Sequence, residues 1–109
     1  MKSKKHRQRC NNPYCVTTKK LRRKFKTKKP VRVFFRRFKA HERRNAMGFV
    51  DYKANTYEIH VDSSRSLDTQ WLVLLHEWAH AMSGPLIGHQ KQWGINHSKV
   101  IRALERKWK

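Results

Sequence analysis

Acidic residues are scarce in this sequence, and they are unevenly placed. It holds seven Asp and Glu against 27 Lys and Arg in 109 residues, which gives a formal net charge of +20. Residues 1–44 contain 19 of the basic residues and a single acid, Glu42, whereas residues 45–109 contain eight basic and six acidic residues. The second part therefore has the charge balance of an ordinary globular sequence, and the first part that of a polycation.

Long apolar runs and cysteines are scarce as well. No segment approaches the roughly 18 apolar residues that a membrane-spanning helix needs. No apolar stretch follows the basic N-terminus to make a secretory signal. With only two cysteines and no export signal, we expect an intracellular, reducing location, either cytoplasmic or nucleoid-associated, or nuclear if the host is eukaryotic.

The two cysteines, Cys10 and Cys15, leave three possibilities open. Together with His6 they could form half of a zinc site, but a closed structural site takes four ligands and no second cysteine pair exists. They could also form a disulfide. The missing second pair and the expected reducing location favour free thiols.

Residues 1–29 combine dense positive charge with few large apolar side chains. Such a segment cannot bury enough apolar surface to order itself, so we predict a largely flexible basic arm. One domain follows, over residues 30–109. A weak apolar stripe predicts a short helix within the arm, over about residues 17–26.

Dense cationic runs bind polyphosphates through counterion release, largely without sequence preference. We therefore expect residues 1–44 to bind DNA or another nucleic acid, rather than to contact an acidic membrane surface, act as an import signal or remain a solvated tail. The predicted contact residues are Lys19, Lys20, Arg22, Arg23, Lys24, Lys26, Lys28 and Lys29. The residues that could extend this surface or stack on bases are Arg32, Arg36, Arg37, Phe25, Phe34 and Phe35.

Three segments rich in β-branched and aromatic residues predict strands at residues 31–38, 47–52 and 56–62. Only three residues separate the last two segments, which predicts a β-hairpin. Residues 40–46 are expected to form a polar connection between the first two strands.

Two helices are predicted after the strands. The first covers residues 71–82, WLVLLHEWAHAM, of which nine of twelve are apolar. Ser66 or Asp68 can cap it, and the Ser-Gly-Pro that follows ends it. The second runs over about residues 89–108 and has one apolar face. The expected fold is α+β, with a small three-stranded sheet packed on the two helices and the basic arm in front.

The polar residues of the first helix are His76, Glu77 and His80. Two histidines four residues apart on a helix lie one turn apart on one side, where both can bind a single metal ion. Burial of these polar groups without a partner would be costly. We therefore predict one catalytic zinc ion here, rather than two core histidines bonded to backbone carbonyls.

A catalytic zinc usually has three protein ligands and one open position. We expect His89 to be the third ligand, because the short connection lets the start of the second helix approach the first. His97, two turns further along, and Glu105 are the alternatives. The close-spaced HExxHxxGxxH pattern is absent, because Leu86 occupies the position of its last histidine.

Glu77 is the predicted general base. Zinc lowers the pKa of the water it binds to about 7. A nearby carboxylate can then take a proton as the water attacks a carbonyl and pass it to the leaving amine. A second group would stabilise the oxyanion, and the candidates are His97, Tyr57, His60 and Tyr52.

The order of these elements resembles that of the SprT-like (Spartan-type) zinc metalloprotease domain. Its most specific parts are His76-Glu77-x-x-His80-Ala81 and Gly88-His89-x-x-x-Trp93, preceded by the hairpin GFVDYKANTYEIHV. The resemblance covers roughly residues 30–109. It implies a zincin-like fold, zinc on the three histidines, Glu77 as general base, and a link to DNA, because such enzymes cleave DNA-attached proteins. The cysteine-rich zinc ribbon of many relatives is absent from this sequence.

The sequence thus predicts a monomeric, zinc-dependent metallopeptidase that its basic arm directs to DNA-associated proteins. By analogy with zincins, the protein substrate would lie along an edge strand above the site, and residues 56–62 are the natural candidate. The alternatives are a nucleic-acid-binding protein with a structural zinc and no proteolysis, and a zinc hydrolase that acts on another class of substrate.

Overall fold

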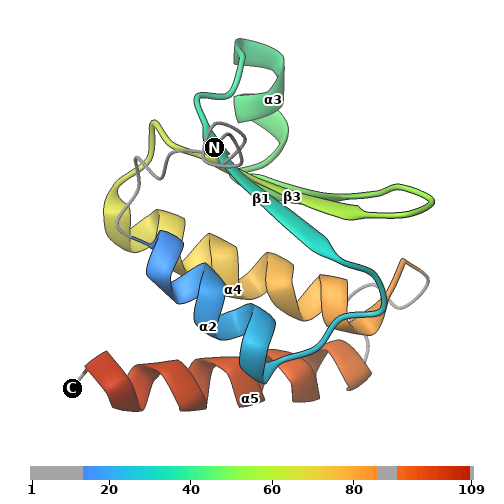
Figure 1. Ribbon diagram of the computed structural model, residues 1–109. Helices are drawn as coiled ribbons and strands as arrows, with labels where there is room; N and C mark the ends of the chain where they lie inside the picture. Colours follow the sequence, from blue (N-terminus) through green and yellow to red (C-terminus); the bar gives the residue numbers. More distant parts are fainter. Residues whose placement is uncertain (1–13, 86–90, 109) are drawn as a thin grey trace, which may run out of the picture.

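The computed structural model describes residues 14–85 and 91–108 and shows an α+β fold (Figure 1). In this part of the chain the elements follow the order α2 (Cys15–Lys24), β1 (Val31–Arg36), α3 (Ala40–Asn45), β2 (Gly48–Tyr52), β3 (Tyr57–Asp62), α4 (Leu67–Ser83) and α5 (Lys91–Trp108). The three predicted strands and both predicted helices are present. No helix among the described residues is both long and apolar enough to cross a membrane.

The three strands form one mixed sheet in the order β1-β3-β2. β2 and β3 are antiparallel and make the predicted hairpin, whose turn is closed by a hydrogen bond from the Lys53 amide to the Thr56 carbonyl oxygen (3.1 Å). β1 runs parallel to β3. The strand over Tyr57–Asp62 is therefore central, and its expected role as the edge strand that holds substrate is wrong. Among the strands that the structure describes, the edge strand beside α4 is β2.

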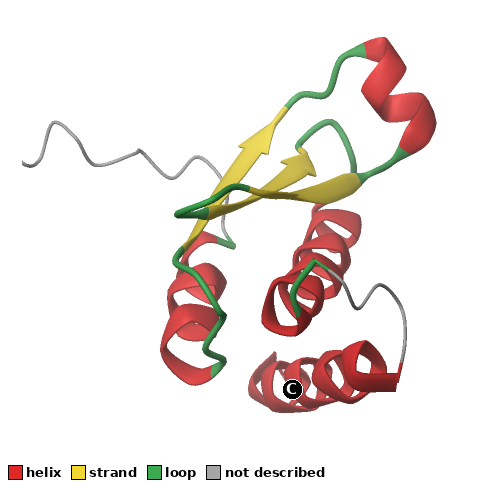
Figure 2. Ribbon diagram, turned by 90° about the vertical axis from the view of Figure 1, so that its right-hand side faces the viewer, coloured by secondary structure: helices red, strands yellow, loops and turns green. Residues whose placement is uncertain are grey.

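The helices lie mainly on one face of the sheet. Figures 1 and 2 show α4 and α2 side by side beneath it, α5 beyond α4, and the short α3 on the opposite side. Alternate residues of β3 point into the core, where Ile59 and Val61 are fully buried. They belong to one apolar cluster with Leu74 and Trp78 of α4 and Val100 of α5.

The boundaries of α4 follow from its capping residues. The Ser66 hydroxyl oxygen accepts a hydrogen bond from the Thr69 amide (3.2 Å), as an N-cap does, and Asp68 lies in the first turn. Gly84 ends the helix with a φ of 92°, a conformation that favours glycine. The described part of the second helix begins at Lys91, and its predicted start at His89 lies outside the described residues.

Residues 14–29 are packed against the rest of the fold, whereas a flexible arm was expected for this segment. The predicted short helix is present as α2, and its Leu21 is fully buried in the core. The Trp78 indole nitrogen donates to the Phe25 carbonyl oxygen (3.0 Å), so the residues after α2 are tied to α4. One buried leucine and this hydrogen bond anchor a strongly basic segment that composition alone classes as disordered.

Cys15 also differs from expectation. It is disulfide-bonded, so the prediction of a free thiol is wrong for this residue. The other cysteine of the sequence, Cys10, lies outside the described residues, as does His6.

The polar connection expected after β1 contains a short helix, α3. The Glu42 carboxylate accepts a hydrogen bond from the Lys39 amide (2.8 Å) and two from the Arg36 guanidinium (3.1 and 2.8 Å). The bonds from Arg36, then that from Lys39, lower the pKa of Glu42 to about 2. The segment has no apolar periodicity, so these local polar contacts define a helix that the hydrophobic pattern could not predict.

Candidate functional site

His76 and His80 lie on the same side of α4, one turn apart, with ring centroids separated by 5.0 Å. Trp93 of α5 packs against both imidazoles, at centroid distances of 4.9 and 5.4 Å. Its indole nitrogen also donates to the His76 carbonyl oxygen (3.4 Å). The two predicted ligands are therefore close together and share one aromatic neighbour that limits how their rings can turn.

Two imidazoles at this spacing suit zinc, which prefers nitrogen and sulfur ligands. Among the side chains described, those of residues 14–85 and 91–103, no group of three or more His, Cys, Asp or Glu is placed to hold a metal ion. The predicted third ligand, His89, lies outside the described residues. The donor set that is described fits two of the three expected positions.

The alternative ligands are only partly described. The His97 ring stacks on Trp93 at 4.7 Å and lies 5.8 Å from the His76 ring, between centroids. It is thus a neighbour of the pair without completing a metal-binding group in the described part of the chain. Glu105 belongs to α5, but its side chain lies outside the described residues.

Glu77 is buried, with 9% of its surface exposed. No hydrogen bond or ion pair within the described residues reaches its carboxylate, and burial raises its pKa to about 7. Buried carboxylates are normally paired, and an unpaired one in a cleft marks a candidate functional group. A bound divalent cation would favour the ionised form and oppose this shift.

Glu77 faces two cavities that lie between α4 and β2. The larger, of about 500 Å³, has an apolar wall that includes Met47, Leu72 and Val73. The smaller, of about 270 Å³, lies beside Tyr52 of β2, and its lining also includes His80. His76, Glu77 and Gly48 line both cavities, so the predicted site residues lie where the two adjoin beside β2, and these adjoining cavities are called the cleft below.

Gly48 allows β2 to approach α4 closely at this cleft. A Cβ atom at this position would lie 2.3 Å from Val73 Cγ1, 3.0 Å from the His60 carbonyl oxygen and 3.5 Å from Glu77 Cγ. Sequence reasoning missed both Gly48 and the packing of Trp93 against the imidazoles. A glycine at the start of a predicted strand was the available signal for the first, and the spacing of Trp93 from His89 was the signal for the second.

The four candidate oxyanion stabilisers occupy different places. Tyr52 lines the smaller cavity and donates its hydroxyl hydrogen to the His80 carbonyl oxygen (3.3 Å). Burial, and then the charge of Glu77, raise the pKa of Tyr52. Tyr57 is a core residue, 4% exposed. His60 lies on the opposite face of the sheet, stacked on Phe34 and Phe49. Only Tyr52 and His97 are near the cleft.

The predicted nucleic-acid-binding residues lie on α2 and the segment that leads into β1. Every described ion pair joins residues between 36 and 65, so in the described part of the chain none of these eight cations is paired with an acid. Arg36, which could extend the basic surface, is instead paired with Glu42 (2.8 Å). Phe25 and Phe35 pack against the core, which makes them poor stacking platforms for bases.

No protein-family model, no curated protein and no solved structure matches this chain. The residues of the cleft and of the basic surface are therefore the features of this chain that indicate a function.

Proposed function

We propose that the protein is a zinc-dependent metallopeptidase that hydrolyses peptide bonds, with a zincin-like site of the SprT type. The observation that carries this proposal is Glu77, a buried carboxylate without a partner in the described structure. It lines a cavity together with two imidazoles that are one helical turn apart. A structural zinc would need no such carboxylate, and a core acid would have hydrogen-bond donors around it.

His76 and His80 would hold the zinc ion, with His89 as the third ligand proposed from the sequence. A zinc ion bound there would polarise the peptide carbonyl and acidify water. Glu77 takes a proton from the water that attacks the carbonyl carbon, and passes it to the nitrogen as the carbon–nitrogen bond breaks. The Tyr52 hydroxyl, which lines the same cavity, is the proposed donor to the oxyanion, and to act so it must exchange its hydrogen bond to the His80 carbonyl oxygen for one to the substrate.

The substrate is proposed to be an extended polypeptide that adds to the free edge of β2. Its main chain would pair with the strand that borders both cavities, in the manner of β-augmentation. Met47 and Leu72, at 45% and 52% exposure, leave the larger cavity with an accessible apolar wall. We therefore expect a preference for an apolar side chain next to the bond that is cleaved.

The basic segment is proposed to bring the enzyme to proteins associated with DNA or another nucleic acid. Eight cations on and after α2 that have no acidic partner among the described residues support this part of the proposal, and the likeness to SprT-like enzymes suggests DNA. The peptidase and nucleic-acid parts depend on different residues, so they can be tested separately.

The test combines zinc stoichiometry with proteolysis. The wild type is expected to hold one zinc ion per chain, and His80→Ala and His89→Ala to lose it, while His60→Ala, on the far face of the sheet, should retain it. Glu77→Gln should retain zinc and lose roughly 10²–10⁴-fold in cleavage rate on a protein substrate with DNA present. A full zinc complement with unchanged proteolysis in Glu77→Gln would refute the catalytic assignment.

Two other functions are outcomes of the same test. Retained zinc without proteolysis in the wild type, together with tight DNA binding, would indicate a nucleic-acid-binding protein with a structural zinc. Hydrolysis of a non-peptide substrate that depends on Glu77 would indicate a zinc hydrolase of another class.

A further inference from the structure

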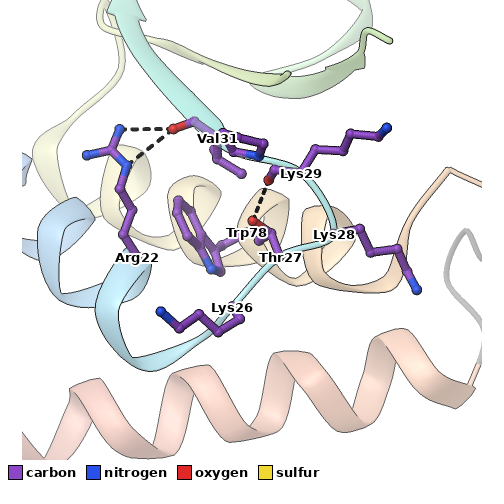
Figure 3. Close-up of a pocket in the computed structure, with 8 residues that line it drawn as sticks. Arg22, Lys26, Thr27, Lys28, Lys29, Val31 and Trp78 are labelled. Atoms are coloured by element: carbon purple, nitrogen blue, oxygen red, sulfur yellow. Dashed lines mark hydrogen bonds between the residues drawn. The ribbon is translucent and has the colours of Figure 1, made fainter. Parts of the chain in front are cut away.

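A basic cavity of about 390 Å³ opens at the β1 edge of the sheet, between α2, the segment that leads into β1, and α4. Figure 3 shows Arg22, Lys26, Lys28 and Lys29 around the indole of Trp78. We propose that this cavity binds phosphate groups of a nucleic-acid backbone. The inference rests on the nucleic-acid part of the proposed function and gives that part a defined site.

The walls of the cavity are tied together by hydrogen bonds. Trp78, which is 1% exposed, donates its indole hydrogen to the Phe25 carbonyl oxygen (3.0 Å). Arg22 donates from Nε and Nη2 to the Val31 carbonyl oxygen (3.2 and 3.0 Å). These bonds hold the end of α2, the connecting segment and β1 in one arrangement, so Arg22 is an oriented cation, and no hydrogen bond from its Nη1 is present in the described part of the chain.

The lysines surround the opening of the cavity. The aliphatic stem of Lys28 lies against Gly84, with Cε 3.2 Å from the position of a Cβ atom there. In Figure 3 the ammonium ends of Lys28 and Lys29 point away from the Trp78 indole. No acidic residue lines the cavity, and no described acid pairs with these lysines. The cations therefore have charge available for an anion.

Two features favour a nucleic-acid backbone over a smaller anion. The unpaired cations continue from the cavity along α2, through Arg23 and Lys24 to Lys19 and Lys20, so a polyanion with repeated charges could contact both groups. The Trp78 ring is buried and offers no stacking surface, so the cavity would contact phosphate and not bases. Binding should therefore show little sequence preference.

The position of the cavity separates it from the cleft. Trp78 and Glu77 are adjacent on α4, so their side chains leave the helix about 100° apart. One lies toward β1 and the other toward β2, which are opposite edges of the sheet. A nucleic acid in the basic cavity would leave the peptide cleft open.

The first test compares two charge-matched double variants of the full chain. Lys26→Gln/Lys28→Gln removes two cations from the cavity, and Lys19→Gln/Lys24→Gln removes two from α2 outside it. The cavity variant should bind a labelled single-stranded or duplex oligonucleotide about tenfold more weakly than the wild type, and the α2 variant about threefold at most, at equal salt. Equal losses would overturn the cavity and indicate a diffuse surface.

The second test keeps the charge. Arg22→Lys should weaken oligonucleotide binding several-fold because the ammonium lacks the oriented guanidinium fork, whereas Arg23→Lys, the matched control outside the cavity, should bind as the wild type does. Thermal unfolding of both variants shows whether lost Val31 contacts change the fold. If Arg22→Lys keeps both wild-type affinity and stability, Arg22 is not a phosphate ligand and the proposal fails.

Inorganic tripolyphosphate distinguishes the sources of phosphate. It should compete with the oligonucleotide for the wild type and the α2 variant, and poorly for the cavity variant. Binding of tripolyphosphate at the cavity without oligonucleotide binding would overturn nucleic acid as the ligand. None of these measurements uses proteolysis, so failure of the peptidase assignment would leave their outcome unchanged, and failure of the cavity would leave the Glu77 test unchanged.

Discussion

Glu77 and Asp62 are both buried carboxylates, at 9% and 0% exposure, but their surroundings differ. Asp62 accepts hydrogen bonds from the Phe38 and Ser64 amides, the Ser64 hydroxyl and the Arg65 guanidinium. Burial acts to raise the pKa of Asp62, but these donors outweigh it and hold the pKa at about 2. Glu77 has only the burial, and its pKa rises to about 7.

The difference separates a structural acid from a candidate catalytic one. The donors to Asp62 come from the end of β1, the loop after β3 and, through Arg43 at 3.9 Å, from α3, so the charge joins three segments. No described residue donates a hydrogen bond to the Glu77 carboxylate, so the charge of Glu77 does not stabilise the fold as that of Asp62 does. A group that costs stability and faces a cleft is more readily explained by the chemistry of that cleft.

Removal of Asp62 should have the largest effect on stability. Asp62→Ala leaves buried amide donors and two arginines without their acceptor, and we expect a loss of about 4 kcal/mol in the free energy of unfolding. Urea denaturation of the zinc-loaded protein measures it. Asp51→Ala is the matched control, because Asp51 is exposed and its one ion pair within the described residues is with Lys53, at 3.9 Å. If Asp62→Ala and Asp51→Ala lost similar amounts of unfolding free energy, Asp62 would not be a structural acid and its contrast with Glu77 would fail.

Glu77 should destabilise the zinc-free protein as the pH rises. Its folded pKa of about 7 lies above the ordinary value of 4.5, so between these values the unfolded chain releases a proton that the folded chain keeps. Stability is therefore lost from about pH 4.5 to about pH 7. Relative to Glu77→Gln, which cannot ionise, the wild type should lose on the order of 3 kcal/mol across this window.

The measurement is the difference in unfolding free energy between the two proteins after chelation, at a series of pH values. Zinc should reduce the difference, because a cation beside Glu77 stabilises its charged form. A difference that does not change with pH in the chelated protein would mean that Glu77 is solvated or paired, and the comparison with Asp62 would fail.

The contrast between the two acids shows what the sequence could and could not predict. The periodicity around His76, Glu77 and His80, the cap at Ser66 and the stop at Gly84 are local signals, and the helix they predict is present. The hairpin was also predicted from a local signal, the three residues that separate its two predicted strands. Asp62 shared a strand face with His60 and gave no sign of burial, because its donors come from segments that are distant in the sequence or lack apolar periodicity.

Two non-local features changed the interpretation of the site. The parallel pairing of β1 with β3 makes β2 the edge strand, and no residue pattern within a single strand encodes that order. Leu21 is one apolar residue among many basic ones, yet its burial anchors α2. One apolar residue hardly changes the mean hydropathy and net charge of such a basic segment. The packing of residues 14–29 therefore could not be predicted from charge and hydropathy.

Asp62 should give the opposite pH dependence from Glu77. Its folded pKa of about 2 lies below the ordinary value of 3.8, so its contribution is fully present above about pH 4 and is lost as the pH falls toward 2. The contribution is on the order of 2 kcal/mol. The stability difference between the wild type and Asp62→Asn measures it, since the other carboxylates are common to both proteins. A difference that grows on acidification would contradict the assignment.

Gly48→Ala should have the smallest effect on stability and should act on Glu77 alone. The new methyl group would meet Val73 Cγ1 at 2.3 Å and the His60 carbonyl oxygen at 3.0 Å. β2 would therefore have to move away from α4, at a cost of roughly 1–2 kcal/mol.

The movement of β2 would admit water beside Glu77, so the pKa of Glu77 should fall and the loss of stability between pH 4.5 and 7 should become smaller. The stability that is lost at acidic pH through Asp62 should be unchanged, because the donors to the Asp62 carboxylate are Phe38, Ser64 and Arg65, none of which belongs to β2. If the mutation left the pH dependence due to Glu77 intact, the burial of that carboxylate would not depend on the close approach of β2, and the cleft would owe its low polarity to α4 and α5 instead.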